Sequence, residues 1–175
     1  MLKELLILPL LTFHGHSVNV SELGPDYAKQ EISCLATNVY HEARNQGVAG
    51  QIAVASVTIN RMNDDRFPNT ICDVVMQGIH KPSWKGTGEM IPVRHKCHFS
   101  WYCDGKSDSI GDVTAYNEIY VLTEMIFNGT LTVLDITEGA THYHADYVTP
   151  SWASTKTKTT EIQDHIFYRW ETANK

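Results

Sequence analysis

The chain has 175 residues, of which 42% are hydrophobic and 19% are charged, and its formal net charge at pH 7 is −6. This composition is typical of one globular domain with a sizeable core and excludes a disordered chain. No run of Lys or Arg stands out, so nucleic acid is not an expected partner.

The N-terminal segment, residues 1–25, contains an apolar run from Leu5 to Phe13 that Pro9 interrupts. The run is too short to span a bilayer as a helix, so no integral membrane domain is expected. It fits the core of a short secretory signal, although Glu4 weakens the positive start of such signals. The alternative is a buried N-terminal segment. We expect export, with residues 26–175 as the folded domain.

Two apolar helices are expected next. In residues 30–44 the apolar side chains share one stripe at 3.6 residues per turn, with Glu42 on its rim and His41 on the opposite side. A half-buried carboxyl group has a raised pKa and can act as a general acid, whereas the simpler interpretation is a boundary Glu. Residues 50–62 are apolar around most of the helix, which indicates a central, buried helix.

The remaining elements predict a mainly α fold with a small β element. A short helix is expected at residues 71–76, and residues 77–111 form a long irregular stretch rich in aromatic side chains. Loops of this length are usually functional or disordered, and the aromatic side chains argue against disorder. Asp112 is a candidate N-cap for a helix that reaches Asn128, with Gly129 after it. The side chains expected to face inward are Val113, Tyr116, Ile119, Tyr120 and Ile126. Residues 157–170 predict one or two strands.

The four cysteines, Cys34, Cys72, Cys97 and Cys103, permit three fully paired connectivities. Cys34 lies on the first helix and can be a buried thiol. The spacing C-x5-C is a poor zinc signature, so a disulfide within Cys72, Cys97 and Cys103 is expected. Such a bond agrees with export.

The histidines raise the question of a metal site. His41 and Glu42 begin like the H-E-x-x-H zinc helix, but Asn45 stands where the second histidine ligand is required. His142, His144 and His165 are an alternative zinc set. We expect no metal and no cofactor.

Aromatic side chains gather in the loop segments and bracket polar ones. A glycan cleft needs flat apolar walls beside hydrogen-bonding groups, because sugar rings have apolar faces and hydroxyl rims. The candidates are Tyr40, Phe99, Trp101, Tyr102, Tyr143 and Trp152, with Asp104, Thr141, His142 and Ser151 as the polar groups.

Six blocks then occur in a fixed order: Y-H-E-A-R-x-x-G, G-Q-I-A-V-A-x-V-x-x-N-R, R-F-P-N-T-I-C, F-S-W-Y-C-D-G, G-A-T-H-Y and P-S-W-A. Together they resemble the bacterial and phage cell wall hydrolases of the spore cortex-lytic type (SleB/CwlJ type) over about residues 33–170. The resemblance implies a lysozyme-like single domain, related to lytic transglycosylases, that acts on peptidoglycan. We expect a monomer that is exported to the periplasm or cell wall, and both a phage lysin and a bacterial enzyme stay open.

The resemblance also implies that Glu42 is catalytic. It would protonate the oxygen of the bond between N-acetylmuramic acid and N-acetylglucosamine and then, as a base, help close a 1,6-anhydro ring. This reaction needs one carboxylate, whereas classical hydrolysis needs two. Arg44 and Arg61 are expected to hold structure through ion pairs. The expected substrate-binding residues are Tyr40, Gln51, Phe99, Ser100, Trp101, Asp104, Thr141, His142, Tyr143, Ser151 and Trp152.

Two departures from the family pattern and two alternatives stay open. Residues 80–96 are longer and richer in His and Lys than the link expected before F-S-W, and no N-terminal peptidoglycan-binding module is recognised. One alternative is a zinc-dependent N-acetylmuramoyl-L-alanine amidase with His142, His144 and His165 as ligands. The other is a non-catalytic glycan-binding module.

Overall fold

The computed structural model describes residues 24–131 and 134–171, so most of the candidate signal lies outside the described residues. The helices are α1 (Pro25–Ala43), α2 (Val48–Met62), α3 (Ile71–Val75) and α4 (Val113–Phe127). The strands are β1 (Gly78–Pro82), β2 (Met90–Cys97), β3 (His142–Ala145), β4 (Thr157–Ile162) and β5 (His165–Arg169), with short 3-10 helices η2 (Ser100–Cys103) and η3 (Ala153–Thr155). The expected fold class, mainly α with a small β element, is confirmed.

Helix α1 is the element around which the other helices pack. Its stripe of Leu35, Ala36, Val39 and Ala43 is fully buried, and α2, α3 and α4 all contact it. Pro25 starts the helix, as is common at a first helical position, where the missing N–H would have no partner. No described helix is both long and apolar enough to cross a membrane.

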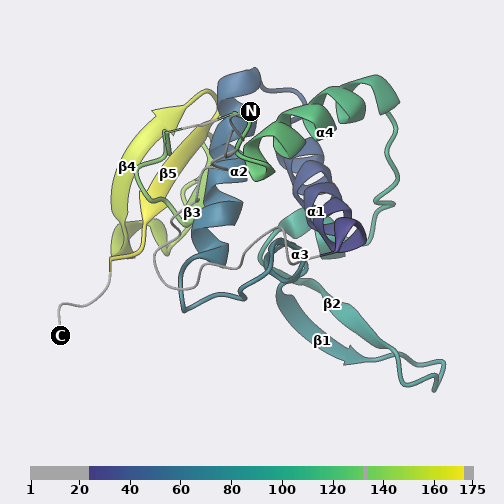
Figure 1. Ribbon diagram of the computed structural model, residues 1–175. Coiled ribbons are helices and arrows are strands. Elements are labelled where there is room, and N and C mark those ends of the chain that lie inside the picture. The colour runs from purple at the N-terminus through teal and green to yellow at the C-terminus, as the bar shows by residue number, and fades with distance from the viewer. Residues whose placement is uncertain (1–23, 132–133, 172–175) are drawn as a thin grey trace, which may run out of the picture.

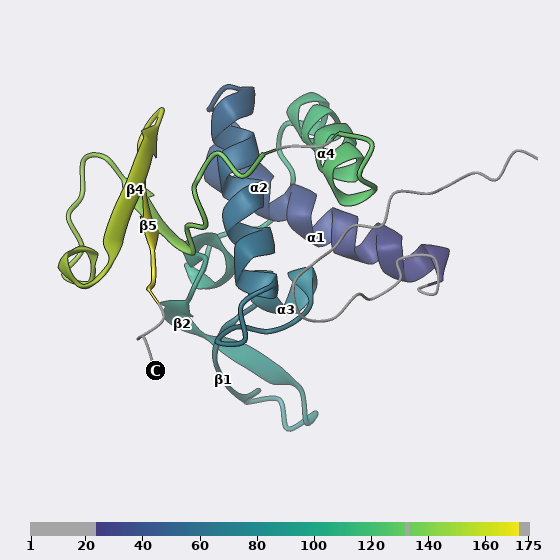
Figure 2. The same cartoon turned by 60° about the vertical axis from the view of Figure 1, so that its left-hand side comes forward.

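Helix α2 is central, as its all-round apolar pattern predicted. One side packs on α1, and the other carries Ala53 and Val57, which pack on Phe167 of β5. The three-stranded antiparallel sheet has the order β3-β5-β4, with Tyr143 paired to Phe167. The turned view shows α2 between this sheet and α1 (Figure 2). Both core clusters therefore depend on α2.

Helix α4 has the predicted ends but not the whole predicted face. The Asp112 side chain accepts a hydrogen bond from the Ala115 N–H, and Gly129 adopts φ +68° after the C-cap. Ile119 is buried, whereas Val113 is 60% exposed, so its inward placement was wrong. Six residues before Ile119, Val113 lies about 120° away around the helix axis.

Residues 77–111, expected to be irregular, contain a β-hairpin. Strands β1 and β2 pair antiparallel with a register shift between Gly78 and His80, and the hairpin projects from the body (Figure 1). A shift of register and the proline Pro92 break the alternation that marks a regular strand, which is why the sequence pattern did not reveal it.

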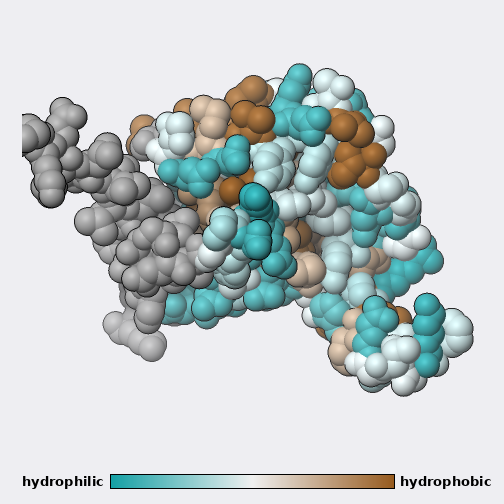
Figure 3. All heavy atoms as spheres, turned by 45° about the vertical axis from the view of Figure 1, so that its right-hand side comes forward, coloured by the Kyte–Doolittle hydropathy of each residue, from teal (hydrophilic) through white to brown (hydrophobic). Residues whose placement is uncertain are grey.

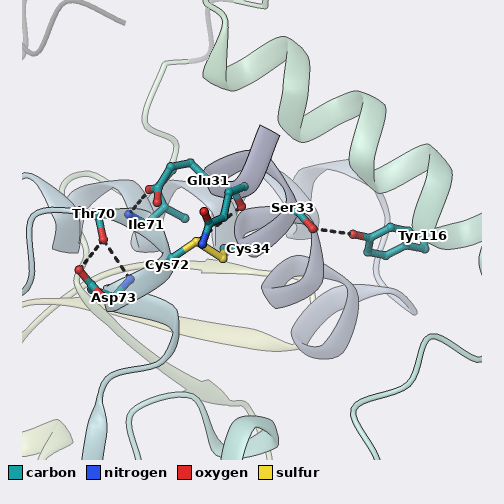
Figure 4. The surroundings of a disulfide bond; sticks show 9 residues. Glu31, Ser33, Cys34, Thr70, Ile71, Cys72, Asp73 and Tyr116 are labelled. Atoms are coloured by element: carbon teal, nitrogen blue, oxygen red, sulfur yellow. Dashed lines mark hydrogen bonds between the residues drawn. A yellow bond between two sulfur atoms is a disulfide. The ribbon is translucent and has the colours of Figure 1, made fainter. Parts of the chain in front are cut away.

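Two disulfides cross-link the described domain, one between two helices and one at the base of the hairpin. Cys97 bonds Cys103, which confirms a disulfide within the expected group of three. Cys34 bonds Cys72 and joins α1 to α3, so the expectation of a buried Cys34 thiol was wrong. Beside this bond Glu31 of α1 accepts a 2.6 Å hydrogen bond from the Ile71 N–H at the start of α3 (Figure 4). Because 38 residues separate Cys34 from Cys72, helical periodicity alone could not show that they meet.

The two disulfides should stabilise the fold unequally. Replacing Cys34 and Cys72 together by Ala should lower the free energy of unfolding by about 4 kcal/mol, and replacing Cys97 and Cys103 by about 2 kcal/mol, because the longer loop gains more entropy on unfolding. Urea unfolding of each double variant measures both losses. Peptide mapping without reductant is the control for connectivity, and equal losses would contradict the loop-length argument.

Candidate active site

Glu42 lies in the last turn of α1, on the wall of an open cavity of about 730 Å³. This volume lies within the range of small-molecule sites. Other parts of the wall come from Arg61 of α2, from η2 and the residues on both sides of it, from β3 and the turn that follows, and from His165 of β5. Segments far apart in the sequence therefore converge on one carboxyl group.

The surroundings of Glu42 favour a carboxyl group that keeps its proton. Burial raises the pKa of Glu42, while the Tyr143 hydroxyl, which donates a 2.7 Å hydrogen bond to it, and the nearby Arg61 lower it. The same burial raises the pKa of Tyr143 well above its ordinary value, so its hydroxyl remains a donor. A carboxyl group with a raised pKa beside a hydrogen-bond donor can release and regain a proton.

Arg61 is a buried cation on α2, only 5% exposed. Its Nε donates a 2.7 Å hydrogen bond to the Thr141 carbonyl, and its guanidinium carbon lies 4.7 Å from the centre of the Phe99 ring. Nη1 is buried without a hydrogen-bond partner among the described residues. The expected structural ion pair of Arg61 is not observed. The guanidinium instead acts on the charge of Glu42.

Trp101 is part of the cavity wall, and a hydrogen bond to a buried residue of α1 holds its ring in place. Its Nε1 donates a 2.9 Å hydrogen bond to Asn38 Oδ1, and Asn38 Nδ2 donates a 3.1 Å bond to Thr58 on α2. The His41 ring stacks on the indole, with centres 4.4 Å apart and planes 16° apart. His41, predicted on the side of α1 opposite the core stripe, lines the same cavity as Glu42, because the cavity extends around the end of α1.

Seven of the predicted site residues share the cavity wall. They are Tyr40, Glu42, Phe99, Ser100, Trp101, Asp104 and Tyr143. The other five, Gln51, Thr141, His142, Ser151 and Trp152, do not line it. The structure thus brings together the residues of α1, η2 and one position of β3.

Strand geometry explains most of this separation. Neighbouring residues of a strand point to opposite faces, so His142 turns away when Tyr143 meets Glu42. Trp152 lies near His142, 5.4 Å between ring centres, and contacts Tyr168 of β5. Gln51 donates to the Gln46 carbonyl near the start of α2, at 3.2 Å. Thr141 is buried and meets Arg61 through its carbonyl.

The alternative zinc set does not converge. His144 donates or accepts through Nε2 with the Tyr168 hydroxyl at 3.0 Å, while His165 packs edge-on against Tyr143, 5.0 Å between ring centres. Within residues 24–131 and 134–171, no group of three or more His, Cys, Asp or Glu side chains is arranged to hold a metal ion. The residues present do not fit the ligand set of a zinc amidase.

The cavity wall also includes residues that the sequence analysis did not place in the site, among them Arg61 and Tyr147. Arg61 stands on a helix whose pattern is apolar all round, and a charge on such a helix is a signal of a buried functional cation. Tyr147, just after β3, also lines the cavity but is 84% exposed, and no periodic pattern marks it.

A family model described as Cell Wall Hydrolase matches residues 45–168. The chain belongs to the cell wall hydrolase family. The match begins three residues after Glu42, so it does not itself include the carboxyl group. The expected family resemblance is confirmed.

The chain is also similar to spore cortex-lytic enzymes. That of Halalkalibacterium halodurans is 28% identical over 142 residues, which are 81% of this chain and 35% of that protein. That of Oceanobacillus iheyensis is 41% identical over 61 residues, 35% of this chain and 21% of that protein. The chain thus spans about a third or less of the length of these relatives.

Two solved structures have a similar fold. The catalytic domain of Bacillus cereus SleB has a TM-score of 0.55 and 25% identity, covering 81% of this chain and 91% of that one. The catalytic domain of the germination-specific lytic transglycosylase SleB from Bacillus anthracis has a TM-score of 0.56 and 26% identity, covering 79% and 93%. The described domain therefore corresponds to nearly the whole of those catalytic domains.

Replacing Tyr143 by Phe tests the link between Tyr143 and Glu42. The hydroxyl stabilises the ionised carboxylate, so its removal should raise the pKa of Glu42 further. A general acid is lost as pH rises through its pKa, so the alkaline limb of the pH–rate profile should move to higher pH. The profile of wall-fragment cleavage measures this shift, with Tyr102→Phe as the control on a tyrosine outside the cavity lining. An unmoved or lowered alkaline limb would contradict the assignment.

Proposed function

We propose that this domain cleaves the glycosidic bond between N-acetylmuramic acid and N-acetylglucosamine in peptidoglycan, as a lytic transglycosylase with Glu42 as acid and base. Membership of the cell wall hydrolase family supports an enzyme acting on the wall rather than a non-catalytic binding module. The similarity to an SleB catalytic domain described as a lytic transglycosylase supports the reaction type.

The observation that carries the proposal is the state of the Glu42 carboxyl group. It reaches an open cavity, yet burial raises its pKa. A carboxyl group with a raised pKa can transfer its proton to the glycosidic oxygen, which makes the sugar oxygen a leaving group. Once ionised, the carboxylate has Tyr143 and Arg61 beside it, and both favour that form.

The ionised carboxylate can then act as the base of the second step. It would take the proton of the muramoyl 6-hydroxyl as that oxygen attacks the anomeric carbon, which closes the 1,6-anhydro ring and returns Glu42 to its acid form. The ring closure consumes no water. Arg61, with one unpartnered N–H group among the described residues, keeps positive charge beside the carboxylate between the two steps.

Asp104 is the natural candidate for a second carboxylate in a classical hydrolysis. It also lines the cavity, and its pKa is lowered, mainly by a hydrogen bond from the Lys106 backbone N–H. Its Oδ1 accepts that N–H at 2.8 Å, so the side chain is already committed to the turn. A half-buried carboxylate that is bound to its own turn is a poorer base for water than a free one, which favours the single-carboxylate reaction.

The aromatic wall supplies a surface for sugar rings. Trp101 is half-buried and held by Asn38, so its ring is fixed before substrate arrives. Sugar rings stack on such fixed aromatic faces at little entropic cost. We include Tyr40, Phe99, Ser100 and Tyr143 in the binding surface.

We further propose that the protein is exported and acts as a monomer at the cell wall or in the periplasm.

Replacing Glu42 by Gln should keep the fold and lower the rate of wall cleavage by about 10²–10⁴-fold, because only the transferable proton is lost. Turbidity loss of purified walls measures the rate. Asp104→Asn should retain activity, and Glu118→Gln on the exposed part of α4 is the matched control. Comparable losses in Asp104→Asn and Glu42→Gln would indicate a two-carboxylate hydrolase.

The products should identify the reaction directly. Mass spectrometry of a digest should find muropeptides with 1,6-anhydro ends, lighter by one water than those with reducing ends. Reducing ends alone would replace the transglycosylase by a muramidase and keep Glu42 as the acid. Free stem peptides with intact glycan strands would instead show an amidase and remove Glu42 from the chemistry.

A further inference from the structure

The β1–β2 hairpin ends in a loop, residues 83–89, that stands clear of the body (Figure 3). Trp84 in this loop is 86% exposed, and Ile79 and Met90 on the strands are 60% and 54% exposed. A Cβ atom built at Gly86 or Gly88 would meet nothing within 4 Å, so the loop is surrounded by open space. Three large apolar side chains are thus presented on one projecting element.

The charge of the hairpin is opposite to that of the chain. Residues 78–97 hold four cations and one carboxylate, a net charge of +3, whereas the whole chain carries −6. The cations are Lys81, Lys85, Arg94 and Lys96, and the carboxylate is Glu89. An anionic surface would attract this hairpin and repel the rest of the molecule, which would orient the protein with the hairpin toward that surface.

Protection of the hairpin edges is the competing explanation for its cations. Lysines on exposed strands prevent edge-to-edge aggregation. That role does not account for Trp84, which lies in the connecting loop rather than on an edge strand. Tryptophan beside lysine is typical of protein segments at a membrane–water interface, where the indole sits at the level of the headgroups.

The hairpin has a defined shape before any partner binds. Ser83 N–H donates to the Glu89 carbonyl at 2.8 Å and closes the loop. At the base, Arg94 Nε donates to the Asp104 carbonyl at 3.0 Å, and the Cys97–Cys103 bond ties β2 to η2. Little conformational entropy would be lost on docking, because the apolar side chains already stand on a closed hairpin.

We propose that the β1–β2 hairpin docks on the surface of a bilayer that contains anionic phospholipids. Trp84 enters the headgroup region, and Lys81 and Lys85 contact lipid phosphates. The base of the hairpin is bonded to η2, which carries Trp101 of the cavity wall, so docking would hold the cavity at a fixed height above the membrane. This inference does not depend on the reaction proposed for Glu42.

Co-sedimentation of the full chain with vesicles tests the proposal. Binding should be strong to phosphatidylcholine vesicles that contain phosphatidylglycerol, weak to phosphatidylcholine alone, and reduced when salt shortens the Debye length from about 10 Å to about 3 Å. Equal binding to both vesicle types, or binding unaffected by salt, would overturn it. Binding to purified walls with none to either vesicle would assign the hairpin to an anionic wall polymer instead, and would also overturn it.

Variants locate the contact. Lys81→Glu and Lys85→Glu should each weaken binding by about fivefold or more, and Trp84→Ala by about tenfold. Lys29→Glu on α1 and Val121→Ser on α4, both exposed, are matched controls that should bind like wild type. The apolar run at residues 5–13 is present in every variant, so differences report the hairpin. Hairpin variants that bind like the controls would refute the proposal.

Cleavage of soluble wall fragments is the internal check. Trp84, Lys81 and Lys85 do not line the cavity, so the rate on soluble fragments should stay unchanged while vesicle binding falls. A parallel loss of both would mean that the substitutions disturb the fold rather than a docking surface, and the proposal would fail. Loss of cleavage in Glu42→Gln, with vesicle binding intact, separates this inference from the proposed reaction.

Discussion

The burial of one carboxyl group beside one buried guanidinium is the constraint on which the site depends. Glu42 lies near the end of α1 and Arg61 near the end of α2. Tyr143 of β3 donates a hydrogen bond from its hydroxyl to Glu42. Burying charges costs free energy unless hydrogen bonds and opposite charge compensate. The Thr141 carbonyl and the Phe99 ring compensate part of the cost of burying the Arg61 guanidinium. The Tyr143 hydroxyl does the same for the Glu42 carboxylate. The incomplete compensation is what keeps the pKa of Glu42 raised.

The frame around this group is built to hold it in place. Helix α2 carries Arg61 and packs on α1 with one side and on the sheet with the other, so both neighbours of the carboxylate are attached to one rigid element. The Asn38–Thr58 hydrogen bond links the same two helices inside the core and continues to the Trp101 ring. In this buried network each of Trp101, Asn38 and Thr58 has a hydrogen-bond partner, and a fully satisfied network of this kind is rigid. It therefore holds the Trp101 ring in a fixed position relative to α1 and α2.

The elements with a clear hydrophobic period could be predicted from the sequence, and those set by long-range contacts could not. The stripe of α1, the all-round burial of α2 and the Asp112 cap of α4 are local patterns, and the structure has all three. The Cys34–Cys72 bond joins residues 38 apart, and the hairpin contains a register shift, so neither leaves a local pattern.

The aromatic loop suggested Trp101 and Phe99 as wall residues because both adjoin polar groups. It could not distinguish Tyr143 from its strand neighbour His142, since the side of a strand that faces the site is decided by the pairing of β3 with β5.

The two disulfides have different relations to the site. Cys34–Cys72 joins α1 to α3 far from the carboxyl group, next to the buried Glu31–Ile71 bond, and so stabilises the helix that carries Glu42 as a whole. Cys97–Cys103 lies between the hairpin and the η2 turn, where a hydrophobic core is thin because β1 and β2 form a separate two-stranded sheet. A two-stranded hairpin is marginally stable alone, so the covalent bond replaces the packing that a third strand would give. The wall bearing Trp101 can therefore stay rigid although the element beside it extends into solvent, and the site keeps its shape without further helices on that side.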